Sequence, residues 1–592
     1  SGADTGTSAD TAEKARYNAI ANENESQTLW RAVGVGGVAG VLDATNLTGT
    51  RNAENLKDIT NKSTVVGNAF VGGITGNLYS TTENDSDATL TGLANQGTVL
   101  AGANYQGSTA GQSRVLGQFF GGIAGYARSL VLDECHSATR SGLSETTLTN
   151  LVQAGYNADG TLNENSPLKG DFVGGLVGFG RDVQMTNCYT ESGYVLGRSF
   201  VGGFVGGFVG SNLYTSGGTN NSYVFGNRYV GGIVSVNGLN STIENMTNKG
   251  LVAGLGANAA YVGGIAGVND AAWGKQDSAA LTKNETAKLV DSVNSMSTVE
   301  VTDKNKIALL QQLSQTRDGT PHYADFVGGV AGCNGTNGQI SWQVGSDKGA
   351  ALGAVLYGGS FVGGVAGYND ATATITNSQA TILSVTGTIV ATGDCVGGVI
   401  GLNGAASLPT VQVSANRIEG VHFVGGVIGA NLPANEFKFV NAGGAAANAA
   451  TIGTGRIVAD GVAGGIIGYN RVVNADTLKN ALQNKNGTIA ADLQTLLPKF
   501  SSGNALDEPA LNPSGSAITL TGLSNQFNIY ANAYVGGIIG YNAADTTLTL
   551  ENASNGNQSH AQSYGGLALS PRADAANGGA YILDSGVSLG KL

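Results

Sequence analysis

The segment Phe172-Val-Gly-Gly-Leu-Val-Gly-Phe179 sets the architecture of this 592-residue chain. It continues through Val183-Gln-Met-Thr-Asn-Cys-Tyr-Thr190 and Gly193-Tyr-Val-Leu-Gly197, and the same opening motif then returns at Phe200-Val-Gly-Gly203. Short runs of β-branched and aromatic residues between glycine turns indicate strands. About 28 residues therefore form three short strands and lead back to the starting motif.

The Gly-Gly pair recurs along the whole chain. Most intervals between copies are 28 to 39 residues, and the longer ones of 49, 53, 65 and 72 indicate loops or insertions. The first glycines of the thirteen copies are Gly36, Gly72, Gly121, Gly174, Gly202, Gly231, Gly263, Gly328, Gly363, Gly397, Gly425, Gly464 and Gly536. A weaker fourteenth copy begins at Gly565.

A repeat of this length with three strands predicts one coil of a parallel β-solenoid. A propeller blade needs roughly 40 to 45 residues and four strands, and neither leucine-rich spacing nor a Ca²⁺-binding nonapeptide is present. We therefore expect an all-β, parallel, right-handed β-helix of about 13 to 14 coils with α-helical insertions. Stacked at about 4.8 Å per coil, the rod would be about 65 Å long.

An aromatic residue precedes the first glycine by two positions in ten copies. Because equivalent residues of successive coils lie above one another, we expect these rings to stack as a column inside the rod, on the same face as the aliphatic residue after the Gly-Gly pair. Small neighbouring residues would make room for the rings. The ten are Phe70, Phe119, Phe172, Phe200, Tyr229, Tyr261, Phe326, Phe361, Phe423 and Tyr534.

Asparagine follows the first glycine by six positions in eight copies. Asn tolerates the left-handed conformation that a coil corner needs, and stacked amides can hydrogen bond along a column. The eight are Asn237, Asn269, Asn334, Asn369, Asn403, Asn431, Asn470 and Asn542.

The opposite face of the Gly-Gly strand is also apolar, with Val directly before the glycine pair in eleven copies. A strand exposed on one side should alternate apolar and polar residues, and this one does not. Two interpretations stay open at this point. Insertions and loops cover the face, or it is an exposed stripe for assembly or partner docking.

Helical periodicity appears only outside the repeats. We expect an N-terminal cap in residues 1–32, with a helix over Ala9 to Ala21, followed by the solenoid over 33–592. Insertions are expected at about 271–325 and 471–533. They would carry helices near 285–293, 306–313, 477–482 and 490–497.

Four cysteines are present, Cys135, Cys188, Cys333 and Cys395. Cys135 and Cys188 each lie 14 residues after the first glycine of consecutive copies, so they should stack within roughly 5 Å. A disulfide fits that distance, and a buried pair of reduced thiols is the alternative. Cys395 replaces a column aromatic, and Cys333 lies out of phase with it.

The composition narrows the classes of partner that this chain can bind. Glycine contributes 94 residues, charged residues are 12%, and the net charge is −12. Acidic balance without clustered Lys and Arg argues against nucleic acid as a partner. No window reaches 18 apolar residues, so no membrane span is predicted.

Motifs for catalysis are missing from the sequence. None of the four histidines belongs to a zinc-protease motif, no phosphate loop is present, and no cofactor or metal site is expected. Asp270 and Asp370 share a phase, seven residues after their first glycine, but at least two coils separate them with Gly335 between. They are the only candidates for a paired-carboxylate site such as polysaccharide-active enzymes use.

The residues Phe172-Val-Gly-Gly-Leu-Val-Gly, Thr186-Asn-Cys-Tyr-Thr190 and Gly193-Tyr-Val-Leu-Gly197 together resemble the GLUG-motif repeats of bacterial surface proteins. These include the non-catalytic repeat region of immunoglobulin A peptidases. The resemblance covers roughly 60% of the chain. It implies a secreted or cell-surface bacterial β-solenoid, and the zinc domain of those peptidases has no counterpart in this sequence.

The functional hypothesis is a non-enzymatic, adhesin-like or structural surface protein, a rigid rod that presents binding loops. Its partner would be a host or bacterial surface protein or a glycan. One alternative is a self-assembling extracellular filament subunit, and another is a polysaccharide-active β-helix enzyme. The sequence starts without a signal segment and stops inside what reads as another coil, so we expect it to be part of a larger surface protein.

Overall fold

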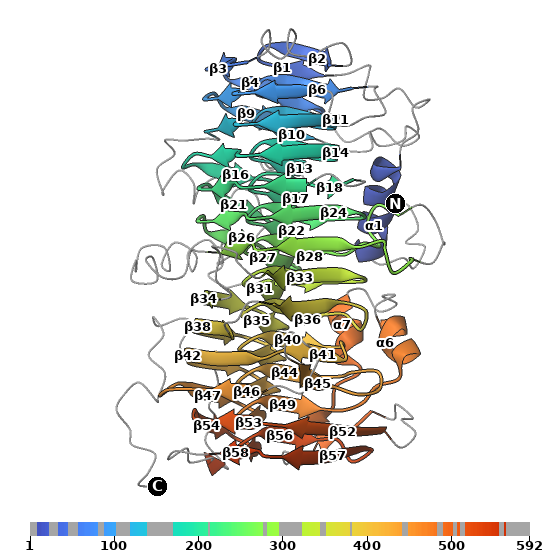
Figure 1. Cartoon of the computed structure of the whole chain (residues 1–592), viewed down its shortest axis with the longest axis vertical. Helices are drawn as coiled ribbons and strands as arrows, with labels where there is room; N and C mark the ends of the chain where they lie inside the picture. Colours follow the sequence, from blue (N-terminus) through green and yellow to red (C-terminus); the bar gives the residue numbers. More distant parts are fainter. Residues whose placement is uncertain are drawn as a thin grey trace.

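The chain folds into a rod of stacked coils (Figure 1). A computed structural model describes residues 9–22, 34–44, 57–80, 88–101, 119–138, 170–210, 214–275, 281–294, 323–343, 351–378, 382–440, 448–481, 489–500, 506–509, 516–555 and 562–563. The expected helix over 306–313 and the fourteenth copy at Gly565 lie outside these residues.

The thirteen Gly-Gly motifs form one parallel sheet. They pair glycine with glycine from the first copy to the last, so Gly36 aligns with Gly72 and Gly464 with Gly536. The expected parallel β-solenoid is thereby confirmed. In sheet order the strands are β1 (Val35–Gly36), β5 (Val71–Gly72), β10 (Phe120–Gly121), β13 (Asp171–Gly174), β17 (Ser199–Gly202), β22 (Arg228–Gly231), β27 (Ala260–Gly263), β31 (Asp325–Gly328), β35 (Val362–Gly363), β39 (Val396–Gly397), β43 (Val424–Gly425), β48 (Val462–Gly464) and β55 (Tyr534–Gly536).

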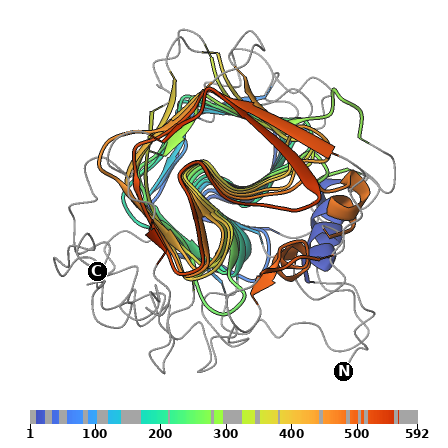
Figure 2. The same cartoon turned by 90° about the horizontal axis from the view of Figure 1, so that it is seen from below.

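Each coil continues from the Gly-Gly strand through further strands that pair with the coils above and below. One coil in the first half of the rod runs β22, β23 (Val234–Asn237), β24 (Ser241–Glu244), β25 (Thr247–Asn248) and β26 (Val252–Gly254). One in the second half runs β39, β40 (Ile400–Asn403), β41 (Ser407–Pro409) and β42 (Val411–Gly420). Seen along the rod, successive coils superpose, and the chain path of each coil folds inward (Figure 2).

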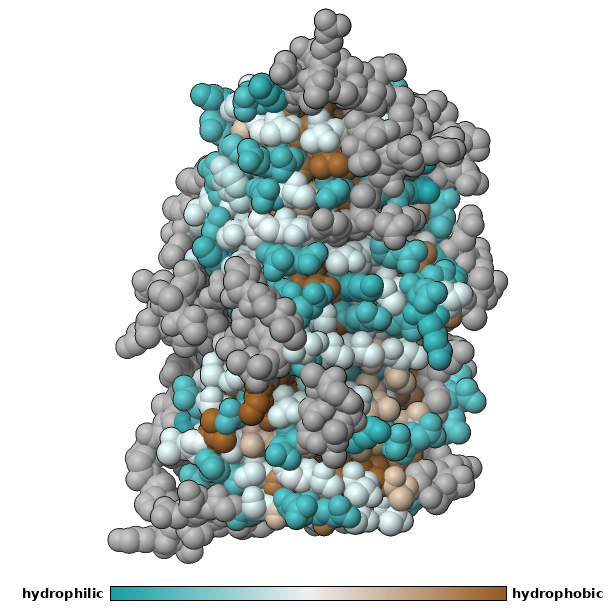
Figure 3. All heavy atoms as spheres, viewed as in Figure 1, coloured by the Kyte–Doolittle hydropathy of each residue, from teal (hydrophilic) through white to brown (hydrophobic). Residues whose placement is uncertain are grey.

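The main core lies inside the coils, and the valine face of the Gly-Gly strand packs into it. Val201, Val230 and Val262 are at most 5% exposed and pack in one cluster with Ile233 and Ile265 from the residues that follow the glycines. The apolar valine face is therefore covered, but by the core of the rod itself and not by insertions. On the face seen in Figure 3, brown apolar side chains form small separate patches among polar ones.

The aromatic column lies on the other face, which corrects the expectation that it fills the interior. These rings belong to a second apolar cluster, separate from the one that contains Ile233 and Ile265. The cause is the backbone: eight of the aromatics, together with Cys395, have φ between 50° and 62°. This left-handed conformation reverses the side-chain direction and breaks the alternation of an ordinary strand. The eight asparagines of the other column do not have positive φ, so the corner role belongs to the aromatics.

Close packing of backbone against backbone explains why glycine occupies these positions. A Cβ atom on Gly263 would lie 1.8 Å from the carbonyl oxygen of Ala266 in the same coil, and one on Gly267 would lie 2.7 Å from that of Ser235. The glycines therefore allow the chain to fold back tightly after each Gly-Gly pair. Making room for the aromatic rings, the reason expected from sequence, is not their main role.

Two of the expected helical regions are confirmed and one is wrong. The helix α1 (Ala9–Ala21) and the pair α6 (Ala475–Ala481) and α7 (Ile489–Gln494) form where periodicity predicts helices. Residues 285–293 instead contain strand β29 (Ala287–Val290), which pairs with β24 and β33 (Gly338–Trp342) as part of a coil. Ala287 and Leu289 point inward and Lys288 outward, which is the period of a strand.

The insertions are accordingly shorter than expected. Strands β29 and β30 (Val293–Asn294) belong to the solenoid, as do β52 (Ser516–Thr521), β53 (Leu523–Asn525) and β54 (Asn528–Ala531). The helix α1 also does not cap the first coil. It lies along the side of the rod, on the same side as α6 and α7 (Figure 2).

Replacing Gly263 by Ala should destabilise the rod strongly, because the new methyl group meets a backbone carbonyl that no side-chain movement can clear. We expect a loss of at least about 3 kcal/mol, measured from the shift of the urea unfolding midpoint. Gly210→Ala is the matched control, since its nearest neighbours would lie 3.5 Å away, and its midpoint should hardly move. Equal midpoints for the two variants would contradict the close-approach explanation.

Candidate binding site

A second apolar layer runs along the side of the rod, between the aromatic column and the apolar residues five positions after the first glycine. We call it the flank groove. Tyr126, Phe179, Val268, Tyr368 and Tyr469 form its second wall, each at most 2% exposed. The sequence pattern contains this wall, because aromatic or aliphatic residues recur at that position, but our sequence analysis did not single it out.

The aromatic column is a continuous stack over eight successive coils. Ring centroids lie 4.4 Å apart for Phe172 and Phe200, 4.8 Å for Phe200 and Tyr229, and 4.8 Å for Tyr261 and Phe326. The stack runs through Phe70, Phe119, Phe172, Phe200, Tyr229, Tyr261, Phe326 and Phe361. Cys395 then interrupts it, so Phe423 and Tyr534 lie outside the continuous stack.

Helix α1 covers the middle of the flank groove. Tyr17 is fully buried, with its ring 5.3 Å from that of Phe179 and 5.2 Å from that of Trp273. Its hydroxyl donates to the carbonyl of Phe208 at 2.8 Å and accepts from the Phe208 amide at 3.0 Å. Both apolar and polar parts of this one side chain therefore fix the helix on the rod.

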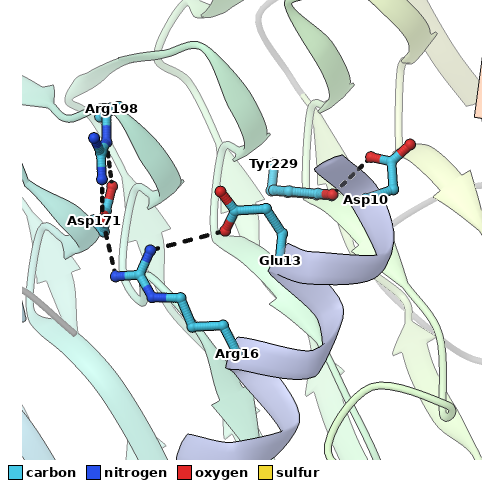
Figure 4. A network of polar contacts seen from close by, with 6 residues as sticks. All are labelled: Asp10, Glu13, Arg16, Asp171, Arg198 and Tyr229. Carbon is cyan, nitrogen blue, oxygen red and sulfur yellow. Dashed lines mark hydrogen bonds and ion pairs between the residues drawn. The ribbon is translucent and has the colours of Figure 1, made fainter. Parts of the chain in front are cut away.

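Polar contacts to buried carboxylates fix α1 at two further points. Figure 4 shows the contacts of Arg16 with Asp171 and of Asp10 with Tyr229. Arg16 donates to Asp171 at 2.9 Å, and Arg198 donates to the same carboxylate at 2.7 and 2.5 Å. Burial acts to raise the pKa of Asp171, but the hydrogen bonds and charges of Arg198 and Arg16 outweigh it and lower that pKa. The folded-state pKa is depressed, so the pair stabilises the docked helix above about pH 4 and weakens only as pH falls below it.

The second anchor is Asp10. It accepts hydrogen bonds from Arg228 and from the hydroxyl of Tyr229, the latter at 2.9 Å. Arg228 is only 8% exposed, so its charge is neutralised inside the contact between helix and rod.

The pair α6 and α7 covers the groove further along the rod. Leu478, Leu493 and Leu497 are at most 3% exposed and belong to the same cluster as Phe423 and Leu402. Phe500 stacks on His422 with ring centroids 4.5 Å apart. The insertions thus cover the aromatic face of the repeats.

Between the parts covered by α1 and by α6 and α7, the flank groove contains a cavity of about 140 Å³. Its aromatic lining consists of Tyr229, Tyr261, Phe326, Tyr368 and Trp273. Its polar lining includes Asp10, Thr11, Lys14, Asp270, Thr336 and Asp370. We call it the flank cavity.

The structure brings Asp270 and Asp370 to this cavity from coils two steps apart. Their neighbours align in register as Asn269, Asn334 and Asn369, so the phase and separation deduced from the sequence hold. Gly335 lies between them, and a Cβ atom there would lie 2.5 Å from Oδ2 of Asp270. The Asp270 carboxylate therefore occupies the space that a side chain at 335 would fill.

The two carboxylates differ in their surroundings. Asp270 accepts from the amide of Ala272 at 2.7 Å, and its Oδ2 lies 3.8 Å from the ammonium of Lys14. Burial raises the pKa of Asp270, and Lys14 acts in the opposite direction. Asp370 accepts hydrogen bonds from the Tyr368 hydroxyl and from the amide and hydroxyl of Thr372.

The eight predicted asparagines form one hydrogen-bonded ladder along the rod. Each side-chain amide donates to the carbonyl oxygen of the next, from Asn237 to Asn542, at 2.8 to 2.9 Å. A second ladder, which our sequence reasoning missed, includes Asn220, Asn248 and Asn294 with bonds of 2.7 and 3.0 Å. Its signal was the recurrent Thr-Asn pair of the third strand, as in Thr247-Asn248. Neither ladder contributes a side chain to the flank cavity lining.

Cys135 and Cys188 lie together in the core as free thiols. Both are at most 1% exposed. Contact with the Cys135 thiol and burial raise the pKa of Cys188 well above its usual value. Cys333 lines the flank cavity, where burial raises its pKa, and Cys395 lies in the aromatic column.

Within the described part of the chain, no group of three or more His, Cys, Asp or Glu side chains is arranged to hold a metal ion. No helix among those residues is long and apolar enough to cross a membrane. Comparison with known proteins gives no match to a family model, a curated protein or a solved structure.

Replacing Tyr17 by Ala should release α1 from the flank groove, because it removes a fully buried ring and both hydroxyl bonds. The expected cost to docking is about 3 to 5 kcal/mol. Trp273 would then become more exposed, which shifts tryptophan emission to longer wavelength, and a protease should cut within 9–22.

Tyr189→Ala is the control, because this ring is 39% exposed and lies on another face. Its emission and cleavage pattern should match those of the unchanged protein. An unchanged emission and cleavage pattern in Tyr17→Ala would refute the assignment of Tyr17 as the anchor.

Proposed function

We propose that this chain is a non-enzymatic, adhesin-like or structural protein of a bacterial surface, secreted or cell-attached, in which the solenoid is a rigid rod. The observation that carries the proposal is the unbroken register of thirteen parallel strands, reinforced by the asparagine ladder. Such a stack fixes the length and direction of the rod, since each coil contacts only its neighbours and adds about 4.8 Å. The GLUG-like repeats support the same proposal.

Loops and insertions would then present the contacts to a surface protein or a glycan. The insertions α6 and α7 and the helix α1 add surface on one side of the rod only (Figure 2). That side is the first place to search for partner contacts.

Exposed apolar side chains in the first and last described coils favour a second candidate, a filament subunit. Val38 and Val41 in the first described coil are 54% and 37% exposed, and Leu550 in the last is 42% exposed. Exposed apolar residues beside open strand edges can pair with another copy. Light scattering on the purified chain separates the two candidates, because the rod proposal requires the mass of one chain and the filament requires a series of larger masses.

A polysaccharide-active enzyme is supported less well. Asp270 and Asp370 do share the flank cavity, but its volume of about 140 Å³ is below the 300 to 1,000 Å³ typical of sites for drug-sized ligands. A polysaccharide chain is larger still and needs a long groove.

The surface proposal is tested by labelling cells of the source organism with antibodies against the purified rod. We expect intact cells, or their culture medium, to carry the protein. An antibody against a cytosolic protein is the control for cell integrity. Signal that appears only after the cells are permeabilised would overturn the proposal.

A further inference from the structure

The flank cavity contains one carboxylate whose charge is not compensated. Asp370 is 6% exposed, and the three hydrogen bonds that it accepts come from the neutral groups of Tyr368 and Thr372. Among the described residues, no Lys, Arg or His lies within ion-pair distance of it. A buried carboxylate without a cation is costly, so this site favours binding a positive charge.

The other two carboxylates of the lining already have cations. Asp10 is paired with Arg228, and Asp270 lies 3.8 Å from the Lys14 ammonium. The polar lining therefore carries one net negative charge, that of Asp370. A ligand that neutralises the site would therefore carry a charge of plus one.

The aromatic lining specifies the chemistry of that cation. Tyr229, Tyr261, Phe326, Tyr368 and Trp273 surround the space, and aromatic faces attract ammonium groups, most of all when water is excluded. The hydroxyl of Tyr261 is buried and has no hydrogen-bond partner among the described residues. An aromatic lining is typical of sites for alkylated ammonium groups.

The protein's own Lys14 shows that this wall accepts an alkylammonium. Its Nζ atom lies 5.7 Å from the ring centroid of Trp273 and 3.8 Å from Oδ2 of Asp270. At the edge of the cavity, the Lys14 ammonium thus contacts an aromatic ring and a carboxylate. A ligand ammonium beside Asp370 would make the same kind of contact.

Other ligand classes fit less well. An anion would meet the net negative charge of the lining, and a neutral apolar molecule would leave Asp370 unpaired. A divalent metal such as Ca²⁺ needs six to eight oxygen ligands, which one free carboxylate among aromatic rings cannot supply.

We propose that the flank cavity binds a small organic monocation of the alkylammonium class, with Asp370 as its charge partner and the aromatic lining around its alkyl groups. Lys14 pairs with Asp270 at the rim and competes for the same negative potential. The proposal does not depend on the rod or filament function.

The test is isothermal titration of the whole chain with choline and with 3,3-dimethylbutan-1-ol, which has the same shape without the charge. Choline should bind with one site per chain, and the neutral analogue at least about tenfold more weakly. Asp370→Asn keeps the shape and the bonds to Thr372, and it should weaken choline binding at least about tenfold. Lys14→Met should strengthen it severalfold, because the competing ammonium is removed.

Glu436→Gln is the matched control, since it also removes one negative charge but from a side chain that is 70% exposed. Its choline affinity should equal that of the unchanged chain. Thermal melting of every variant checks that the rod is intact, and melting of the unchanged chain with saturating choline gives a second readout for Asp370→Asn if that variant is unstable.

Three results would overturn the proposal. They are no choline binding or stabilisation, equal binding of choline and the neutral alcohol, and unchanged affinity in a folded Asp370→Asn variant. Binding of a neutral sugar in place of choline would assign the cavity to a different ligand class and would equally refute it.

Discussion

The close approach of backbone to backbone at the Gly-Gly strand is the constraint on which the rest of this structure depends. A Cβ atom at Gly263 would come within 1.8 Å of a carbonyl oxygen, and the equivalent glycines of the other coils are similarly tight. Only glycine permits the chain to fold back so closely. The path that results buries both faces of the strand, and each coil therefore contributes to two apolar layers.

The positive φ of the aromatic residue is the second constraint, because it directs the ring away from the main core. A left-handed residue costs about 1 to 2 kcal/mol, and the stacked rings and their burial offset that cost. Since the rings point away from the main core, the rod has an apolar groove along its side. Helices α1, α6 and α7 are then required as covers, and the stretch between them forms the flank cavity.

Much of this fold could be predicted from the sequence, because the repeat itself encodes it. The thirteen glycine pairs predicted the number and register of the coils. The recurrent asparagines predicted a ladder, and their side-chain amides do form one. The face of the aromatic column was predicted wrongly, because period 2 assumes an extended backbone and these residues have positive φ. The strand over Ala287–Val290 was mistaken for a helix, because a short apolar run fits both periods.

The flank cavity was beyond sequence reasoning for a different reason. Asp270 and Asp370 share a phase, and this was visible, but Lys14 and Asp10 come from a helix that lies more than 200 residues away in the chain. Nothing in the sequence shows that this helix lies along the side of the rod instead of over its end. Contacts between distant segments depend on packing, which the repeat pattern does not describe.

The Gly-Gly strand is buried on two faces, with valine inward and the aromatic column toward the helices. A crystal structure of the chain at side-chain resolution would test this arrangement. We expect Phe172, Phe200 and Tyr229 at positive φ, stacked beneath α1, with Val201 and Val230 facing Ile233 inside the coil. Rings packed inside the coil at negative φ, with the valines toward α1, would contradict it.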